Sequence, residues 1–448
     1  MKGLIVFCLN FALVVGNGVA IQAQSKTKPA KPGRTPDAAS KISSASGSPS
    51  ASPSASINAE RLARIPERMK WFVEHGRSAG IVTLVAHRGK VVQLSAIGVQ
   101  DLESSAPMKE DTIFQIASMT KPITCVGVMI LAEDGLLAIT DPVEKFLPAF
   151  ANLQIREKKE GEDLEEVRKP KRKITIRDLM THTSGMGSGY PDGFKDLFDK
   201  RDRTLAEAVD AFPTRFLDFE PGARWSYSNM GIATLGRIIE VVSGKSYEAF
   251  LEERIFKPLA MNDSHIFVPE SKRSRIATIY KLDGEKLSKA DVDLYRTGAK
   301  YSAPEAGLYS TAPDLFRFYQ MMLNWGLSGN MPDSKRILSK AAVELMTQVH
   351  TGDLKAGFSP GIGYGLGWAV VRNVEGMFRL NSIGTYGHGG LWKTYGFIDL
   401  RKELIGVILM QRLDGDGDMA DEFSAFMTMA AAAVRYGERE RPELPAIR

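Results

Sequence analysis

Residues 114–122 read Phe114-Gln-Ile-Ala-Ser118-Met-Thr-Lys121-Pro122, and an apolar run over residues 123–131 follows them. A small residue and a serine ahead of an amphipathic helical pattern place Ser118 in the first turn of a helix. Pro122 is tolerated there because the first amides have no partner within the helix. Three residues are about one turn, so Lys121 projects from the same face as Ser118, close enough to share a proton with it. Backbone N–H groups at a helix start also favour a developing oxyanion.

The Ser-x-x-Lys spacing is not specific by itself. Ser25 and Lys28 show the same spacing in a segment rich in serine, proline and lysine. An ordinary helix cap therefore explains Ser118 equally well until further motifs are considered.

The chain has 448 residues and a formal net charge of +5. This length exceeds one ordinary core and predicts one large two-lobed unit or two domains. Residues 1–57 hold six of the 58 basic and one of the 53 acidic residues, which leaves 52 of each sign in the remainder. The excess charge belongs to this N-terminal segment, so the composition indicates no nucleic-acid partner.

The N-terminus resembles an export signal. The apolar run over residues 4–15, followed by small residues, predicts a signal peptide over residues 1–23 and a secreted or periplasmic protein. The run is too short to span a bilayer, so no stable membrane span is expected after processing, although a retained N-terminal anchor is the alternative. The two cysteines are Cys8 and Cys125; with Cys8 in the signal, no internal disulfide is possible in the mature chain.

Residues 24–57 consist mainly of Ser, Pro, Ala and Lys and predict a disordered linker. Residues 58–438 are predicted to form one domain, in which a charged stretch over residues 156–173 is expected to be a solvated insertion. Helical spacing begins near Ala59 and dominates again over residues 204–256.

Strand-like patterns lie towards both ends of the domain. The predicted strands are residues 80–87, 91–96, 365–371, 394–400 and 404–410, and the predicted final helix is residues 419–436. Because β segments at both ends bracket a helical middle, we predict an α/β fold of the α+β type. One antiparallel sheet would be flanked by helices and carry an inserted all-helical lobe.

Two further polar motifs lie downstream. An ammonium beside Ser118 cannot accept a proton, so a lysine base needs a third polar group. Tyr227-Ser-Asn229, the only Tyr-x-Asn in the chain, supplies one, and the periodic run after it predicts that Tyr227 begins a helix. A buried aromatic at a helix start is the plain alternative. The stretch Tyr386-Gly-His388-Gly-Gly390-Leu391 precedes an alternating strand pattern, and its glycines allow the backbone to approach a ligand closely.

These three motifs, in this order, resemble those of class C β-lactamases and the related family VIII carboxylesterases, acyltransferases and DD-peptidases. The similarity extends over about residues 60–435. It includes phrases typical of the wider family: Leu179-Met-Thr-His-Thr-Ser-Gly185, Val242-Ser-Gly244, Pro258-Leu-Ala-Met261 and Gly307-Leu-Tyr-Ser-Thr311.

The resemblance implies a β-lactamase/transpeptidase-like fold and a serine hydrolase that works through an acyl-enzyme. Ser118 would be the nucleophile, and Lys121 and Tyr227 together would form the base that deprotonates it and later activates water. The N–H groups of Ser118 and Leu391 would form the oxyanion hole, and Asn229 would orient the substrate or Lys121. The expected substrate-binding residues of the third motif are His388, Gly389 and Gly390.

The third motif departs from that of true class C β-lactamases, which carry Lys-Thr-Gly there. Because that lysine helps to hold the carboxylate of a β-lactam, we expect a carboxylesterase-like enzyme that acts on an ester or amide. The alternatives are a β-lactamase or a D-Ala-D-Ala carboxypeptidase. The substrate would be a small ester, amide or β-lactam, or a peptidoglycan stem peptide, and no cofactor is expected.

Other candidate sites are weaker. Gly357-Phe-Ser359-Pro-Gly361 matches the Gly-x-Ser-x-Gly of α/β-hydrolases, but Pro360 lacks the N–H that their oxyanion hole needs, so Ser359 is expected to be a loop residue. His182 is expected to be a hydrogen-bonded structural histidine. The six histidines show no metal-binding spacing.

A catalytically silent cell-envelope module that binds peptidoglycan stems or a protein partner is the alternative of another class. A silent descendant has no physical reason to keep Ser118, Lys121 and Tyr227 together. The complete set therefore favours an enzyme.

Overall fold

The computed structural model describes residues 56–158, 165–284, 286–329, 334–377, 379–414 and 421–435. Ile57–Arg435 form one compact unit. The predicted signal peptide, and the predicted linker except for its last two residues, lie outside the described residues.

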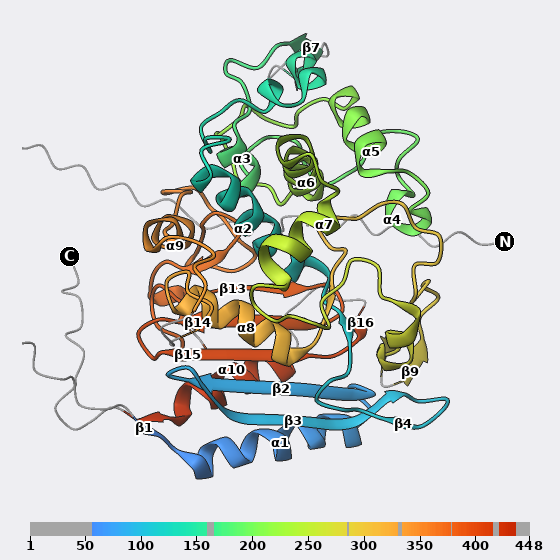
Figure 1. Cartoon of the computed structure of the whole chain (residues 1–448), viewed down its shortest axis with the longest axis vertical. Helices are drawn as coiled ribbons and strands as arrows, with labels where there is room; N and C mark the ends of the chain where they lie inside the picture. Colours follow the sequence, from blue (N-terminus) through green and yellow to red (C-terminus); the bar gives the residue numbers. More distant parts are fainter. Residues whose placement is uncertain are drawn as a thin grey trace, which may run out of the picture. The chain divides into compact units, whose positions relative to one another are not determined.

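An eight-stranded antiparallel sheet carries the fold, in the order β11-β12-β13-β14-β15-β2-β3-β4 (Figure 1). Its strands are β2 (Gly80–His87), β3 (Lys90–Asp101), β4 (Ala106–Pro107), β11 (Ile362–Tyr364), β12 (Ala369–Val371), β13 (Tyr386–Gly390), β14 (Thr394–Asp399) and β15 (Leu404–Leu409). β15 pairs with β2 from Leu404–His87 to Leu409–Val82. The prediction that both ends of the chain build one sheet is thus confirmed.

The two faces of the sheet bury alternating side chains, as the period of a strand requires. One face packs on α1 (Ala59–Glu74) and α10 (Asp421–Ala433) through residues such as Ile81 and Ile408. The other face, with Val82 and Val407, joins the larger core under α8 (Ala312–Leu323). Strands covered by helices on both faces have little solvent exposure, which explains the nearly continuous apolar sequences of β2 and β15.

The predicted helical lobe is inserted between β5 and α8 and lies beyond β13 in Figure 1. Its helices are α2 (Thr120–Glu133), α3 (Ile176–Met180), α4 (Leu197–Lys200), α5 (Leu205–Ala211), α6 (Asn229–Ser243) and α7 (Tyr247–Leu251), and α9 (Lys340–Thr347) follows α8. The short strands are β1 (Ser56–Ile57), β5 (Phe114–Gln115), β6 (Ile155–Lys158), β7 (Glu165–Arg168), β8 (Tyr280–Asp283), β9 (Lys286–Lys289), β10 (Tyr309–Ser310), β16 (Arg412–Asp414) and β17 (Val434–Arg435).

One local prediction needs correction. The predicted strand over residues 365–371 contains only β12, because Gly367, with φ of +85°, turns the chain between β11 and β12. Within the predicted solvated insertion, β6 and β7 pair as an antiparallel hairpin, and Arg168 forms an ion pair with Glu220.

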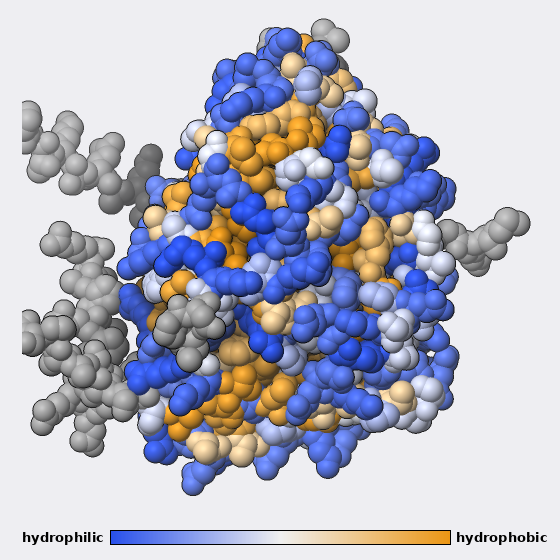
Figure 2. Space-filling view, in the orientation of Figure 1, coloured by the Kyte–Doolittle hydropathy of each residue, from blue (hydrophilic) through white to orange (hydrophobic). Residues whose placement is uncertain are grey.

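The face shown in Figure 2 is mostly hydrophilic, with hydrophobic patches between the polar residues. Some apolar surface is normal for a folded protein. None of the helices in the described ranges is both long enough and apolar enough to cross a bilayer.

Candidate active site

The structure brings Ser118 and Lys121 into contact, as predicted. Ser118 lies in a 3-10 turn, Ala117–Met119, that leads directly into α2. The Lys121 Nζ donates hydrogen bonds to Ser118 Oγ at 3.0 Å and to the Glu305 carbonyl at 2.8 Å. Ser118 is partly exposed, whereas Lys121 is 0% exposed. A ligand can therefore reach the hydroxyl while the amine stays away from water.

The backbone before Ser118 is strained. Ala117 has φ of +46°, in the left-handed region that residues with a Cβ rarely adopt. Such strain persists only where the surrounding structure holds the chain, and it is concentrated at functional sites. Here it fixes the orientation of Ser118 at the helix start.

Burial changes the protonation of Lys121. Desolvation lowers its pKa to about 7, although Glu305 and Cys125 oppose this shift. An exposed lysine has a pKa near ~10.4 and is almost fully charged at neutral pH. A large fraction of Lys121 is therefore neutral near pH 7 and can accept the Ser118 proton.

Glu305 is a site residue that the sequence analysis missed. Its carboxyl group is fully buried and accepts hydrogen bonds from Tyr190 at 3.0 Å and from Tyr301 at 3.1 Å. Burial raises its pKa, against the effects of the backbone, of Lys121 and of the two tyrosines. In the sequence, the feature that could have pointed to Glu305 is a single acidic residue within the apolar stretch before Gly307.

Tyr227 lies beside Lys121 but does not begin the helix. Ser228 caps α6, its Oγ accepting from Gly231 N at 3.0 Å, so the helix starts at Asn229, two residues later than predicted. The Lys121 Nζ lies 4.6 Å from the centre of the Tyr227 ring.

Tyr227, expected to form the base together with Lys121, has a pKa that disfavours a phenolate. Burial raises the pKa of its phenol; a hydrogen bond with Ser118 opposes the shift and Glu305 adds to it. The nearby Lys121 does not offset the loss of hydration, so the phenolate is disfavoured. Tyr227 thus carries its proton at neutral pH and acts as a hydrogen-bond partner, while Lys121 is the group able to take up a proton.

His182 holds the segment that carries Tyr227, which confirms the structural role predicted for it. Its Nδ1 accepts from Ser228 N at 3.1 Å, and its carbonyl accepts from Ser226 N at 2.9 Å. The ring is buried, which lowers its pKa well below the usual range, with Lys121 and His388 adding to the effect. A neutral imidazole can accept this backbone hydrogen bond, whereas an imidazolium cannot.

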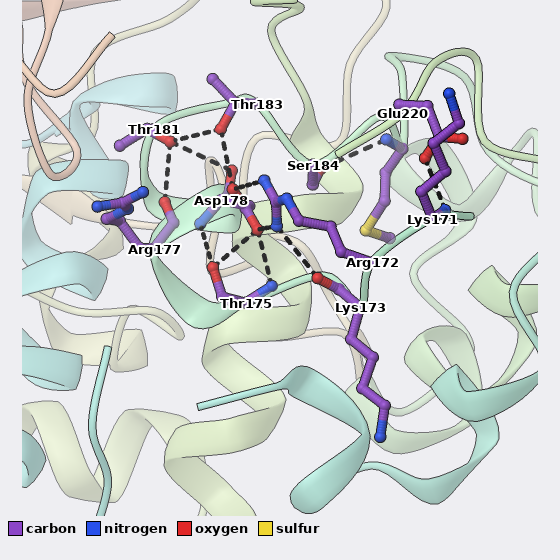
Figure 3. Close-up of polar contacts among 11 residues, drawn as sticks. Lys171, Arg172, Lys173, Thr175, Arg177, Asp178, Thr181, Thr183, Ser184 and Glu220 are labelled. Carbon is purple, nitrogen blue, oxygen red and sulfur yellow. Dashed lines mark hydrogen bonds and ion pairs between the residues drawn. The ribbon is translucent and has the colours of Figure 1, made fainter. Parts of the chain in front are cut away.

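Asp178 anchors the chain next to His182 through Thr183, and Figure 3 shows the contacts of its carboxylate. Its carboxylate accepts from both Nη atoms of Arg172 at 2.6 and 2.8 Å, from the backbone and hydroxyl of Thr175 at 2.8 and 2.7 Å, and from Thr183 at 3.3 Å. Burial raises the pKa of Asp178, but the hydrogen bonds from Arg172 and Thr175 outweigh burial and hold it below its usual range.

We expect Asp178→Ala to lower the free energy of unfolding by about 3 kcal/mol, because it removes the carboxylate that completes the capping box begun by Thr175 and leaves donors on Thr175 and Thr183 unpaired at ~1–3 kcal/mol. Urea denaturation measures this loss. The difference from the wild type should begin to shrink as the pH falls below about 4, where this carboxyl is protonated in the unfolded chain, and should be lost as the pH falls through the lower pKa of the folded protein. Exposed Asp283→Ala is the control and should change stability by less than about 0.5 kcal/mol. An equal loss in both variants would contradict the anchoring role.

The third motif itself forms a strand, and it precedes the predicted strand β14. His388, Gly389 and Gly390 belong to β13, next to the 3-10 turn of Ser118. A Cβ at Gly390 would overlap the Ile116 carbonyl oxygen, so a glycine is required here for the close approach of β13 to the residues before Ser118. Leu391 follows the strand with its side chain 54% exposed.

His388 is fully engaged with the protein. Its Nδ1 donates to the Gly389 carbonyl at 2.7 Å, which leaves Nε2 to accept from the Tyr364 hydroxyl at 3.0 Å. Burial lowers its pKa to about 3, and Lys121 contributes in the same direction. His388 is therefore neutral at physiological pH and supplies no positive charge where related β-lactamases have a lysine.

The other predicted residues are placed as follows. Asn229 is the first residue of α6, and its Oδ1 is buried without a hydrogen-bond partner among the described residues. Ser359 lies in the loop between α9 and β11, as expected. No group of three or more His, Cys, Asp or Glu side chains in the described ranges could hold a metal ion.

The sequence matches the Beta-lactamase family model over residues 64–425. Penicillin-binding protein 4* of Bacillus subtilis is 27% identical over 382 residues, which cover 81% of this chain and 74% of that protein. Esterase EstB of Burkholderia gladioli is 29% identical over 367 residues, covering 76% and 88%. The solved structure of EstCE1, described as a hydrolase with promiscuous acyltransferase activity, matches with a TM-score of 0.70 at 22% identity, covering 83% of this chain and 99% of that one.

The chain therefore belongs to the β-lactamase family, a group of serine hydrolases that includes esterases and penicillin-binding proteins. The predicted β-lactamase/transpeptidase-like fold is confirmed.

Proposed function

We propose that the protein is a serine hydrolase that acts through an acyl-enzyme on uncharged esters. The observation that carries the proposal is the 3.0 Å contact between Ser118 Oγ and a fully buried lysine whose pKa is lowered to about 7. A structural lysine in a core is instead expected to be paired with a carboxylate.

The geometry supports the following sequence of steps. Lys121 accepts the proton of Ser118 as Oγ attacks the ester carbonyl, and the N–H groups of Ser118 and Leu391 stabilise the oxyanion. The proton passes to the departing alcohol oxygen, and the acyl group stays on Ser118. Water then attacks the acyl carbon while Lys121 accepts its proton; the bond from that carbon to Ser118 Oγ breaks, Lys121 returns the proton to Oγ, and the acid is released. Tyr227 orients the Ser118 hydroxyl.

The neutral state of His388 supports an ester over a β-lactam or a D-Ala-D-Ala peptide, both of which carry a carboxylate. The likeness to esterase EstB points the same way. The likeness to penicillin-binding protein 4* is the observation that favours the alternative, a peptidase.

A substrate panel tests the proposal. Nitrophenyl acetate and butyrate should be hydrolysed with a kcat/KM at least about 100-fold higher than nitrocefin or a D-Ala-D-Ala peptide. The reason is that the carboxylate of the latter two substrates finds no positively charged partner at His388. Efficient turnover of nitrocefin or of the peptide would overturn the ester assignment. The absence of fluorophosphonate labelling at Ser118 would instead favour the silent binding module.

We also propose that the protein is exported, on the basis of the signal-like pattern in residues 1–23. The mature chain should lack about 20 to 23 N-terminal residues and be found outside the cytoplasm. Mass spectrometry of the N-terminal peptide, with cell fractionation, measures both. An intact Met1 in the cytoplasmic fraction would contradict export.

A further inference from the structure

Phe358 has an unusual position for a large apolar side chain. It is 78% exposed, yet its ring centre lies 5.2 Å from that of Tyr227 and 5.5 Å from that of Trp225. Aromatic rings at these separations are in contact. The side chain therefore faces solvent immediately beside the tyrosine that contacts Ser118.

Trp225, Phe358 and Tyr364 form what we call the aromatic wall, next to Tyr227. The Trp225 ring lies 5.6 Å from that of Tyr364 and 6.3 Å from that of Tyr227. Tyr364 is buried, so the wall rests on the protein core and presents Phe358 at its outer edge.

The backbone holds Phe358 in place. Gly357 and Gly361 have φ of +74° and +72°, and a Cβ at Gly361 would overlap the backbone around Gly376. The Gly361 carbonyl accepts from Arg372 N at 2.8 Å. These contacts fix the backbone three residues after Phe358, and the ring contacts with Trp225 and Tyr227 hold the exposed side chain itself.

Proton transfer fixes which part of an ester lies beside the wall. In acylation a bond forms between Ser118 Oγ and the acyl carbon, and the bond between that carbon and the alcohol oxygen breaks. The proton from Ser118, held on Lys121, is delivered to the alcohol oxygen. The departing alcohol therefore lies on the side of Ser118 where Lys121 and Tyr227 lie, which is the side of Phe358.

We propose that the aromatic wall binds the alcohol portion of the substrate and selects esters of aromatic or bulky apolar alcohols. This inference rests on the proposed function. An apolar alcohol would cover the exposed face of Phe358 and remove it from water, and ring-to-ring contact would favour an aromatic one. A charged alcohol portion would gain nothing from this surface.

The test compares Phe358→Ala with the wild type on two ester series. One series keeps the acetyl group and varies the alcohol, with ethyl, phenyl and 1-naphthyl acetate; the other keeps phenol and varies the acyl chain, with acetate, butyrate and octanoate. We expect kcat/KM to fall about tenfold for 1-naphthyl acetate and less than about twofold for ethyl acetate. Within the phenyl series the loss should not depend on acyl length. Deacylation of the common acetyl-enzyme, measured after a burst, should be unchanged because the alcohol has already left.

Two variants serve as controls. Phe358→Trp should retain the preference, and Phe267→Ala, at another exposed phenylalanine, should change neither series. Equal losses for ethyl and naphthyl acetate, or a loss that grows with acyl length, would overturn the inference while leaving the hydrolase itself intact. A wild-type enzyme that hydrolyses none of these esters and is not labelled by fluorophosphonate would instead contradict the proposed function, and the inference with it.

Discussion

Replacing Ser118 by alanine should reduce turnover of every ester substrate by about four to six orders of magnitude, because it removes the atom that we propose forms the acyl-enzyme. The protein should remain folded, since the Ser118 hydroxyl caps no helix. Steady-state kinetics and fluorophosphonate labelling measure the loss, and thermal unfolding followed by circular dichroism checks the fold.

Ser359→Ala is the matched control for this prediction. Ser359 lies in a loop, within the sequence that matches the α/β-hydrolase pattern, and its variant should keep nearly full activity. An inactive Ser359→Ala enzyme together with an active Ser118→Ala enzyme would show that the nucleophile has been assigned to the wrong serine.

Replacing Lys121 by methionine should lower kcat/KM by about three orders of magnitude, within the range that general-base catalysis supplies. Methionine fills the buried space without a charge, so the loss should not come from unfolding. Tyr227→Phe should be less damaging, because the phenol keeps its proton and contributes through its hydrogen bond to Ser118. The double variant should be little worse than Lys121→Met alone, since the two residues act on one hydroxyl. Tyr295→Phe, at an exposed tyrosine, is the control.

The pH profile separates a lysine base from other mechanisms. In the proposed mechanism the neutral amine of Lys121 is the active form, so wild-type kcat/KM should rise with pH through about 7 and level off above it. Glu305 raises the pKa of Lys121, so Glu305→Gln should move this rise to lower pH. His182 and His388 also face the site, but both have lowered pKa values and stay neutral over this range. Two results would contradict the assignment of Lys121 as the base. One is a rise in kcat/KM that occurs at the same pH in Glu305→Gln as in the wild type; the other is that the losses in kcat/KM of Lys121→Met and Tyr227→Phe are additive.

Local geometry explains what could be predicted from the sequence. One helical turn brings Lys121 to Ser118 whatever surrounds them, and a nearly continuous apolar run marks β15 because this strand is buried on both faces. The start of α6 was misplaced by two residues because Ser228, rather than Tyr227, satisfies the free amides of the helix.

The remaining features depend on contacts between distant parts of the chain. Glu305 reaches Lys121 across 184 residues, so no local pattern could assign it to the site. The neutral state of His388 follows from its burial beside Lys121 and from its bond to Tyr364, which bring together residues from several segments. Sequence motifs thus predicted which residues meet, whereas their protonation states required the packed structure.

The pairing of β15 with β2 bears on how the molecule reaches its folded state. The partners Leu409 and Val82 are more than 300 residues apart, so the loop between them must close before the centre of the sheet exists. Contacts of such long range slow folding, because the entropy of closing the loop is lost before the contact stabilises the chain. A nascent polypeptide shorter than about 410 residues lacks part of β15 and leaves an edge of β2 unpaired. Assembly of the sheet therefore has to follow synthesis of nearly the whole chain, and shorter fragments would expose a strand edge that is prone to aggregate.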